Sequence, residues 1–218
     1  MFLHHHALLI IIGHLFAAEA YTGYQARPPR PGRKFSTQKV QEALHTGGRL
    51  PMDVALHTVI NDKLVTVPIS DIFAGKKVAV VGVPGCFTKT CRKHMNNFKK
   101  HRDELLQHVD QVVCISVNDA YVMDAFKESN DFDGILMLAD GNARFAKRTG
   151  LAMDTGAFGG VRLNRLSMIV DDGVVMSLNI EKDCAYTGET SAETLLGTLG
   201  VTVPSSSSSS TLAKESEE

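Results

Sequence analysis

The residues best suited to chemistry lie in a short segment that ends at a cysteine, Val83-Pro84-Gly85-Cys86-Phe87-Thr88-Lys89-Thr90-Cys91. An apolar run over residues 78–83, typical of a buried strand, precedes it, and a helix is predicted over residues 90–107. Sites in open α/β sheets form at the carboxyl ends of strands, where a helix start offers free N–H groups and the positive end of its dipole. The position of Cys91 in that first turn therefore favours a stabilised thiolate, which is the nucleophilic form of cysteine.

Polar neighbours in the sequence add to this environment. Thr88 stands three residues before Cys91, so its hydroxyl can cap the helix and reach the surroundings of the sulfur. Arg92 and Lys93 follow Cys91 directly, and nearby cations stabilise a thiolate. Either cation stabilises the thiolate only if its side chain points at the sulfur.

The same residues have other interpretations. A cysteine near a helix start is more often a small buried hydrophobe than a nucleophile. Cys86, Cys91 and His94 carry the atom types of zinc ligands, but a fourth ligand and a compact zinc spacing are missing. The spacing from Cys86 to Cys91 is not C-x-x-C, which disfavours a thiol–disulfide oxidoreductase.

The elements that must position this segment alternate along the chain. Buried strands are predicted at residues 78–83, 112–117 and 136–139, hairpins at 57–60 with 64–67 and at 166–170 with 174–178, and helices at 90–107, 121–128, 144–149 and 191–199. Parallel strands need covering helices, and hairpins supply antiparallel edges. The order therefore predicts an α/β fold, a three-layer sandwich with a mixed central sheet.

Composition excludes several classes of protein. The chain has 218 residues, of which 44% are hydrophobic, enough for one substantial core. A formal net charge of −1 and the absence of Trp disfavour a general nucleic-acid binder. Four cysteines are too few for a disulfide scaffold, so their value is expected to be chemical.

The two ends of the chain differ from its middle. We expect a targeting segment and linker at residues 1–34, one domain at 35–204, and a disordered, Ser-rich acidic tail at 205–218. The apolar run at residues 7–12 is too short to span a bilayer. It fits either a secretory signal or a mitochondrial presequence, and the excess of Arg and Lys over the single acid Glu19 in residues 1–40 favours the mitochondrion.

The segment around Cys91 resembles a known family. Pro84, Thr88 and Cys91 fit the Pro-x-x-x-Thr-x-x-Cys signature of the peroxiredoxins, and residues 82–88 are similar to the form found in the peroxiredoxin-5, or type II, subfamily. Further blocks that resemble this subfamily follow in the same order at residues 114–123, 138–141, 165–175 and 178–181. The resemblance covers residues 50–199.

This resemblance implies a thioredoxin-like fold and a thiol-dependent peroxidase that reduces hydrogen peroxide and alkyl hydroperoxides through a sulfenic acid at Cys91. It implies that Thr88 hydrogen-bonds the peroxide, that Arg165 supplies a fixed positive charge with Arg162 as its rival, and that Pro84 shields the pocket. Thioredoxin, or glutathione with glutaredoxin, is the expected reductant. We expect a homodimer, and neither a metal, a cofactor, nucleic acid nor a membrane as a partner.

Three points stay open at the sequence level. The sulfenic acid could be resolved by Cys114, by Cys184 or by an external thiol, while Cys86 stands where the subfamily commonly has Ala and is either silent or forms a side disulfide with Cys91. His94 stands three residues after Cys91, where the subfamily commonly has His at four, so its role is in doubt. The alternative function is a redox sensor or holdase that passes oxidation to a partner protein.

Overall fold

The computed structural model describes residues 43–202. The predicted targeting segment at 1–34, the tail at 205–218 and the domain boundaries at 35 and 204 lie outside them. The strands are β1 (Ala55–Ile60), β2 (Lys63–Pro68), β3 (Lys77–Val83), β4 (Gln111–Ser116), β5 (Ile135–Ala139), β6 (Ala152–Asp154), β7 (Val161–Leu163), β8 (Leu166–Asp171) and β9 (Val174–Ile180). The helices are α2 (Ile69–Phe73), α3 (Lys89–Leu105), α4 (Ala120–Glu128), α5 (Arg144–Arg148) and α6 (Ala192–Thr198), with 3₁₀ turns η1 (Gly156–Phe158) and η2 (Lys182–Cys184).

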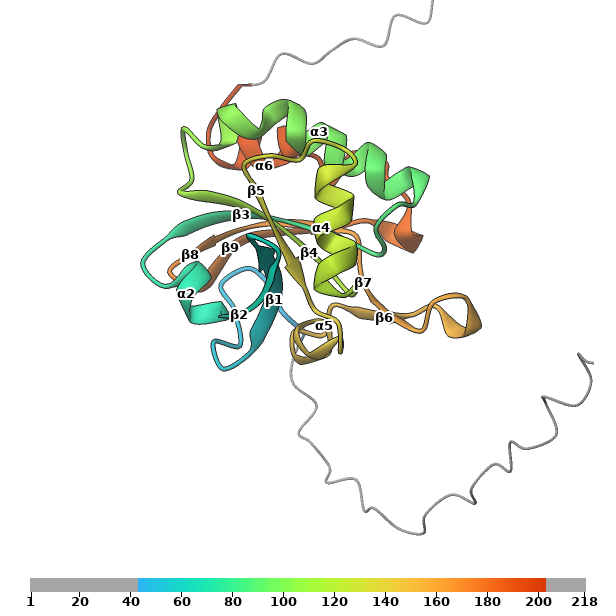
Figure 1. The fold of residues 1–218 in the computed structure, drawn as a ribbon. Helices are drawn as coiled ribbons and strands as arrows, with labels where there is room; N and C mark the ends of the chain where they lie inside the picture. Colours follow the sequence, from blue (N-terminus) through green and yellow to red (C-terminus); the bar gives the residue numbers. More distant parts are fainter. Residues whose placement is uncertain (1–42, 203–218) are drawn as a thin grey trace, which may run out of the picture. The chain divides into compact units, whose positions relative to one another are not determined.

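A seven-stranded mixed sheet forms the middle of the fold, in the order β2-β1-β5-β4-β3-β8-β9 (Figure 1). The strands β3, β4 and β5 are parallel neighbours, whereas β1 and β8 pair with them antiparallel. The parallel strands are almost fully buried and rich in Val and Ile, as expected for strands covered on both faces. The predicted mixed sheet is confirmed.

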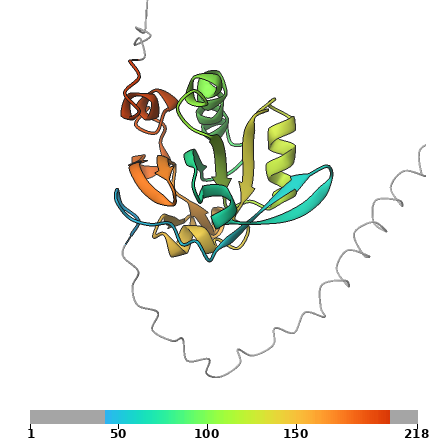
Figure 2. The same cartoon turned by 90° about the vertical axis from the view of Figure 1, so that its left-hand side faces the viewer.

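Helices cover both faces of this sheet, so the fold has three layers (Figures 1 and 2). One face carries a core built with residues of α3, α4 and α6, among them Phe98, Met123 and Leu195. The opposite face carries a core built with α2 and α5, including Phe73 and Phe145. The predicted three-layer sandwich is therefore confirmed.

Two predicted hairpins form as expected, because their turn residues accept left-handed backbone angles. Asn61 and Asp62 join β1 to β2 with φ of 50° and 59°, and Asp172 and Gly173 join β8 to β9 with φ of 45° and 75°. Helix α2 and the small β6–β7 hairpin were not predicted from the sequence. These elements have five and three residues, too few to show a periodic pattern.

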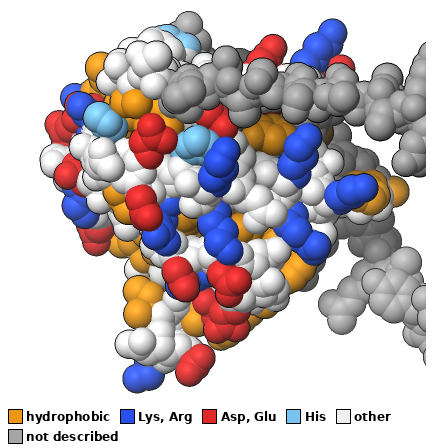
Figure 3. All heavy atoms as spheres, turned by 90° about the horizontal axis from the view of Figure 1, so that it is seen from above, with side chains coloured by type: hydrophobic (Ala, Val, Ile, Leu, Met, Phe, Trp, Pro, Cys, Tyr) orange, Lys and Arg blue, Asp and Glu red, His pale blue; other side chains and the backbone are white. Residues whose placement is uncertain are grey.

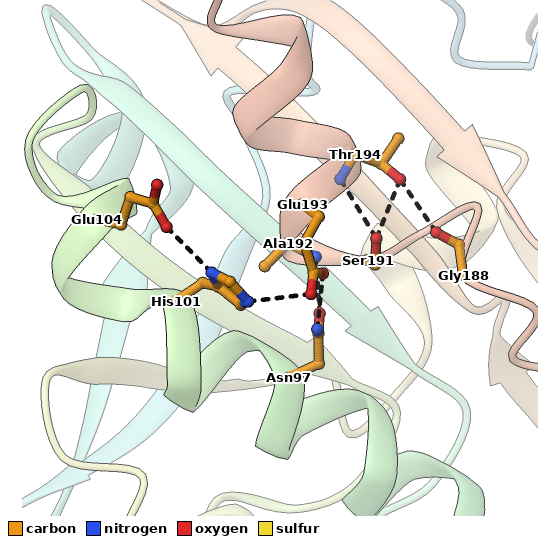
Figure 4. Close-up of polar contacts among 8 residues, drawn as sticks. All are labelled: Asn97, His101, Glu104, Gly188, Ser191, Ala192, Glu193 and Thr194. Carbon is orange, nitrogen blue, oxygen red and sulfur yellow. Dashed lines mark hydrogen bonds and ion pairs between the residues drawn. The ribbon is translucent and has the colours of Figure 1, made fainter. Parts of the chain in front are cut away.

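Helix α6 is fastened to α3 by polar side chains (Figure 4). Asn97 on α3 donates to Glu193 Oε2 at 2.7 Å and accepts from the backbone N–H of Ala192 at 2.8 Å. His101 lies one turn further along α3. Its Nδ1 is 3.0 Å from Glu104 Oε2, and its Nε2 is 3.0 Å from Glu193 Oε1. These contacts hold the segment that enters α6 against α3, close to the site described next.

No helix within residues 43–202 combines the length and the apolar character needed to cross a bilayer.

Candidate active site

Cys91 is the third residue of α3, just beyond the carboxyl end of β3, and its side chain is only 1% exposed. Its backbone N–H donates to Thr88 Oγ1 at 3.3 Å, and Thr88 in turn donates its hydroxyl to the Gly85 carbonyl at 3.2 Å. Thr88 is thus the N-cap residue of α3. The cap fixes the loop between β3 and α3 and holds the cysteine at the positive end of the helix dipole.

Arg165 lies between β7 and β8 and is 2% exposed, the largest of the fully buried side chains. Its guanidinium donates from Nη2 to Cys91 Sγ at 3.4 Å, from Nη1 to His94 Nδ1 at 3.2 Å, and from Nε to the Cys184 carbonyl at 3.2 Å. A buried cation therefore contacts the sulfur directly, and three acceptors hold it there, two of them on α3 and one in η2.

The other predicted cations lie elsewhere. Arg162 donates from Nη1 to the Val117 carbonyl at 2.8 Å and is half-buried in the wall of the same pocket. Arg92 and Lys93 are exposed on α3, and Lys93 Nζ lies 5.7 Å from the centre of the Tyr186 ring. The structure brings Arg165 to the sulfur and leaves Arg92 and Lys93 at the surface.

A pocket of about 330 Å³ opens over Cys91. Its lining combines donors around the sulfur with apolar and sulfur-bearing side chains, namely Pro84, Gly85, Cys86, Thr88, Thr90, Cys91, Asn118, Met153, Thr155, Phe158, Arg162, Arg165 and Cys184. All four residues of the predicted catalytic set, Pro84, Thr88, Cys91 and Arg165, are among them. Phe158 on the rim is 90% exposed.

Of the three remaining cysteines, two line this pocket and one does not. Cys184 in η2 and Cys86 in the β3–α3 loop are half-buried and line the pocket. The Cys184 thiol contacts the sulfur of Met153 at 3.0 Å, and the Cys86 thiol contacts the sulfur of Met123 at 3.3 Å. Cys114 lies in the centre of β4 with no exposed surface. Burial raises the pKa of the Cys86 thiol to about 12, with a further contribution from the nearby Cys91, and burial raises the pKa values of Cys114 and Cys184 as well. All four are free thiols.

Behind Arg165 lies a polar chain that the sequence analysis missed. His94 is fully buried, and its Nε2 lies 2.8 Å from the Thr190 carbonyl. Burial lowers the pKa of His94 to about 4. Glu181 holds the loop between η2 and α6 in place, because its carboxylate accepts from the Thr190 N–H at 3.3 Å and from the Thr190 hydroxyl at 3.2 Å. Glu181 stood in a block that carried the resemblance, but nothing in the sequence places it near His94.

A metal site does not emerge from these groups. Within residues 43–202, no cluster of three or more His, Cys, Asp or Glu side chains is arranged to hold a metal ion. The ring nitrogens of His94 face Arg165 and Thr190, so they are not available beside Cys86 and Cys91.

Comparisons with known proteins agree with this geometry. The Redoxin family model matches residues 45–196. Peroxiredoxin-2E, chloroplastic, of Arabidopsis thaliana is 38% identical over 177 residues, which cover 77% of this chain and 74% of the relative. The chain belongs to the peroxiredoxins. Peroxiredoxin-2F, mitochondrial, of the same plant is 37% identical over 142 residues, covering 63% of this chain and 71% of that one.

Solved structures give the same result for this peroxiredoxin. Reduced Prx3 in complex with hydrogen peroxide, from Vibrio vulnificus, superimposes with a TM-score of 0.68 at 42% sequence identity, covering 72% of this chain and 99% of that one. Peroxiredoxin 5 from Alvinella pompejana gives a TM-score of 0.62 at 27% identity, covering 72% and 98%. The predicted family and thioredoxin-like fold are confirmed, and the peroxiredoxin is a thiol-dependent peroxidase.

Proposed function

We propose that Cys91 is the residue that attacks the peroxide. Its thiolate sulfur bonds to one oxygen of the hydroperoxide, the O–O bond breaks, and the other oxygen leaves as an alcohol or water after taking up a proton. The sulfur is oxidised by two electrons to a sulfenic acid, and the peroxide is reduced by two. The observation that carries this proposal is the contact of the buried Arg165 guanidinium with Cys91 Sγ at 3.4 Å, at the base of a pocket.

The donors around the sulfur support this assignment. Negative charge moves from the sulfur to the departing oxygen during the attack, so fixed donors aimed at both lower the barrier. The Arg165 guanidinium donates to the sulfur, while the Thr88 hydroxyl and the Cys91 N–H, which bond within the helix cap, border this end of the pocket together with Pro84. In this scheme Arg165 stabilises the developing charge, Thr88 orients the peroxide, and Pro84 limits the access of water.

For the second step, we infer that Cys184 is better placed than Cys114 to resolve the sulfenic acid. Its thiol attacks the Cys91 sulfur, a disulfide forms and water leaves. Cys184 lines the same pocket as Cys91 and belongs to a short 3₁₀ turn, whereas Cys114 is paired with Val81 and Met137 in the middle of the sheet. Cys114 has no exposed surface, so its thiol is less accessible than that of Cys184 to a sulfur oxidised in the pocket.

The reductant then returns the disulfide or the sulfenic acid to the thiol. The family implies a thioredoxin-type reductant, and we propose thioredoxin or glutathione with glutaredoxin. The two are distinguished by steady-state turnover with each reducing system supplied separately. Loss of turnover with both systems would contradict this part of the proposal.

The experiment that tests the proposed function is stopped-flow oxidation of the reduced full chain by hydrogen peroxide and by an organic hydroperoxide, with Cys91→Ser as the control. We expect fast oxidation that disappears in the Cys91→Ser variant. Oxidation of the wild type no faster than that of a free thiol would contradict it, and would favour the alternative of a redox sensor or holdase.

Mass spectrometry of the quenched product identifies the resolving thiol. A Cys91–Cys184 disulfide in the wild type, absent in Cys184→Ser and present in Cys114→Ser, is the expected result. The Cys184→Ser variant is well matched because Arg165 contacts the backbone carbonyl of residue 184, which the substitution retains. A disulfide to Cys114 or Cys86, or a persistent sulfenic acid, would contradict the assignment.

We propose an organellar location, in the mitochondrion. The support is the basic segment before residue 40, which lies outside the described residues, together with relatives named as chloroplastic and mitochondrial. Residues 1–40 fused to a fluorescent protein should direct it to mitochondria, whereas entry into the secretory pathway would favour the signal-peptide interpretation.

A homodimer stays a prediction of the resemblance. Sedimentation of the full chain over a range of concentrations should give the mass of two chains, and the mass of one chain throughout would contradict it.

A further inference from the structure

The two ring nitrogens of His94 have partners that permit only one protonation state. Nδ1 lies 3.2 Å from Arg165 Nη1, and a guanidinium carries donors only, so Nδ1 must accept. Nε2 lies 2.8 Å from the Thr190 carbonyl, which only accepts, so Nε2 must carry the proton. The imidazole is therefore neutral, in the Nε2–H tautomer.

We propose that His94 is a positioning residue for this peroxidase, which holds Arg165 in the orientation that addresses Cys91. The inference rests on the proposed role of Arg165 and Cys91. The guanidinium reaches the sulfur through Nη2 only while Nη1 and Nε have acceptors of their own, His94 Nδ1 and the Cys184 carbonyl. Without the His94 acceptor, Nη1 would be a buried donor with no partner, a costly state that rotation of the group would relieve.

His94 can set this orientation because it is itself held on several sides. Its Nε2 also lies 3.2 Å from Thr190 Oγ1, and its ring packs against Phe98 and Tyr186 at centroid distances of 5.4 Å and 4.6 Å. Glu181 accepts both polar hydrogens of Thr190, and its own N–H donates to the Arg165 carbonyl at 3.0 Å. The chain of contacts therefore closes on itself, from Arg165 through His94, Thr190 and Glu181 back to Arg165.

The spacing of His94 is compatible with this arrangement. Position 94 is three residues after Cys91 on the same helix, so both side chains project from one face of α3, toward Arg165. A residue four positions after Cys91 would lie on the same side of the helix, so the bond to Arg165 rather than the spacing identifies His94.

Two substitutions separate the bonds of His94. In His94→Asn the side-chain oxygen takes the place of Nδ1, so the acceptor for Arg165 is kept and the bond to Thr190 is lost. In His94→Gln the side-chain amide nitrogen takes the place of Nε2, so the bond to Thr190 is kept and the acceptor for Arg165 is lost. The unfolding midpoint of each variant reports how much of any effect is merely structural.

We expect the rate of oxidation by hydrogen peroxide to fall roughly 10- to 100-fold in His94→Gln and to stay within about threefold of wild type in His94→Asn. A wild-type rate in His94→Gln would overturn the proposal, as would equal losses in both variants that follow their unfolding midpoints. Failure of the proposed function is recognised separately, because the wild type would then react no faster than Cys91→Ser.

A second measurement needs no variant. Long-range ¹H–¹⁵N spectra of the wild-type histidine rings at neutral pH should show His94 as the neutral Nε2–H tautomer. A protonated ring or the Nδ1–H tautomer would overturn the proposal, because Nδ1 could then not accept from Arg165.

Discussion

Arg165 is the residue on which the chemistry at Cys91 depends most. Its planar fork donates to Cys91 Sγ, to His94 Nδ1 and to the Cys184 carbonyl at the same time, in a site almost without solvent exposure. A lysine has one ammonium group on a flexible stem, so it cannot meet three acceptors arranged in a plane.

We therefore expect Arg165→Lys to slow oxidation by hydrogen peroxide about 100-fold, although the charge is retained. The matched control is Arg162→Lys, because Arg162 lies in the same pocket wall but donates to the Val117 carbonyl rather than to the sulfur. Stopped-flow rates of the two variants check the prediction. A larger loss in Arg162→Lys would reverse the assignment of the charge.

At the scale of elements, α3 and α4 start in the same way at the carboxyl ends of two parallel strands. Thr88 accepts from the Cys91 N–H at 3.3 Å, and Asp119 accepts from the Val122 N–H at 3.0 Å. Both side chains cap a helix, but only the first cap adjoins the reactive cysteine.

We expect Thr88→Ala and Asp119→Ala each to lower the free energy of unfolding by about 1 kcal/mol, as the loss of a helix cap does. Only Thr88→Ala should also slow the reaction with peroxide, and Thr88→Ser should restore both properties. Urea unfolding and stopped-flow rates measure the two effects. Equal peroxide rates in the two alanine variants would show that Thr88 acts as a cap alone.

The contact between α3 and the loop before α6 should make the stability of the fold depend on pH. Burial lowers the pKa of His94 from 6.5 to about 4, and Arg165 lowers it further, while the Thr190 carbonyl and Glu181 oppose the shift. Tyr186 packs on the ring, but burial raises its pKa to about 12, so it stays neutral. Between pH 6.5 and 4 the unfolded chain binds a proton that the folded chain does not bind.

The free energy of unfolding should therefore fall as pH falls from 6.5 toward 4, by on the order of 3 kcal/mol from His94 alone. Above pH 6.5 the ring is neutral in both states and contributes no slope. Urea unfolding at several pH values, with His94→Asn beside the wild type, isolates the contribution of His94 to the pH dependence of the free energy of unfolding. Parallel pH profiles for the two proteins would contradict it.

At the scale of the whole molecule, charge is placed unevenly. The net charge is only −1, yet Figure 3 shows several Lys and Arg side chains close together on the face in view, with Asp and Glu beside them. Lys89, Arg92 and Lys93 of α3 are exposed beside the site. A second pocket of about 560 Å³ lies there, lined by two cations, Lys89 and Lys93, and one acid, Asp183, together with Tyr186 and Cys184. An anionic reductant would approach the oxidised cysteine along this face.

We expect recycling by glutathione, which is anionic, to slow as salt concentration rises, while oxidation by neutral hydrogen peroxide stays constant. Lys93→Gln should lower the glutathione-dependent rate severalfold, and Lys76→Gln, an exposed lysine in the loop before β3, should not. Rates that do not respond to salt would exclude a steering role for these cations.

Signals between neighbouring residues were enough to predict the strands, the hairpins and the first turn of α3. Apolar runs specify the buried strands β3, β4 and β5, and turn residues such as Asp172-Gly173 specify the hairpins, because these signals act between neighbours along the chain. The relation of Thr88 to Cys91 is equally local, since a cap and the residue three positions later lie in one helical turn. The succession of these elements was enough for the mixed three-layer fold.

The tertiary structure decided every relation across the sheet. The family resemblance named Arg165 with Arg162 as its rival, but the contact itself comes from the antiparallel pairing of Gly82 with Leu166, which brings residue 165 to the end of β3, beside α3. The same holds for His94, whose partners Arg165 and Thr190 are 71 and 96 residues away. Contacts at such separations depend on how strands pair and helices pack, which no local pattern encodes. The sequence and its family resemblance therefore indicated the nucleophile, Thr88, Pro84 and Arg165, while the roles of His94 and Thr190 beside Arg165 came only from the fold.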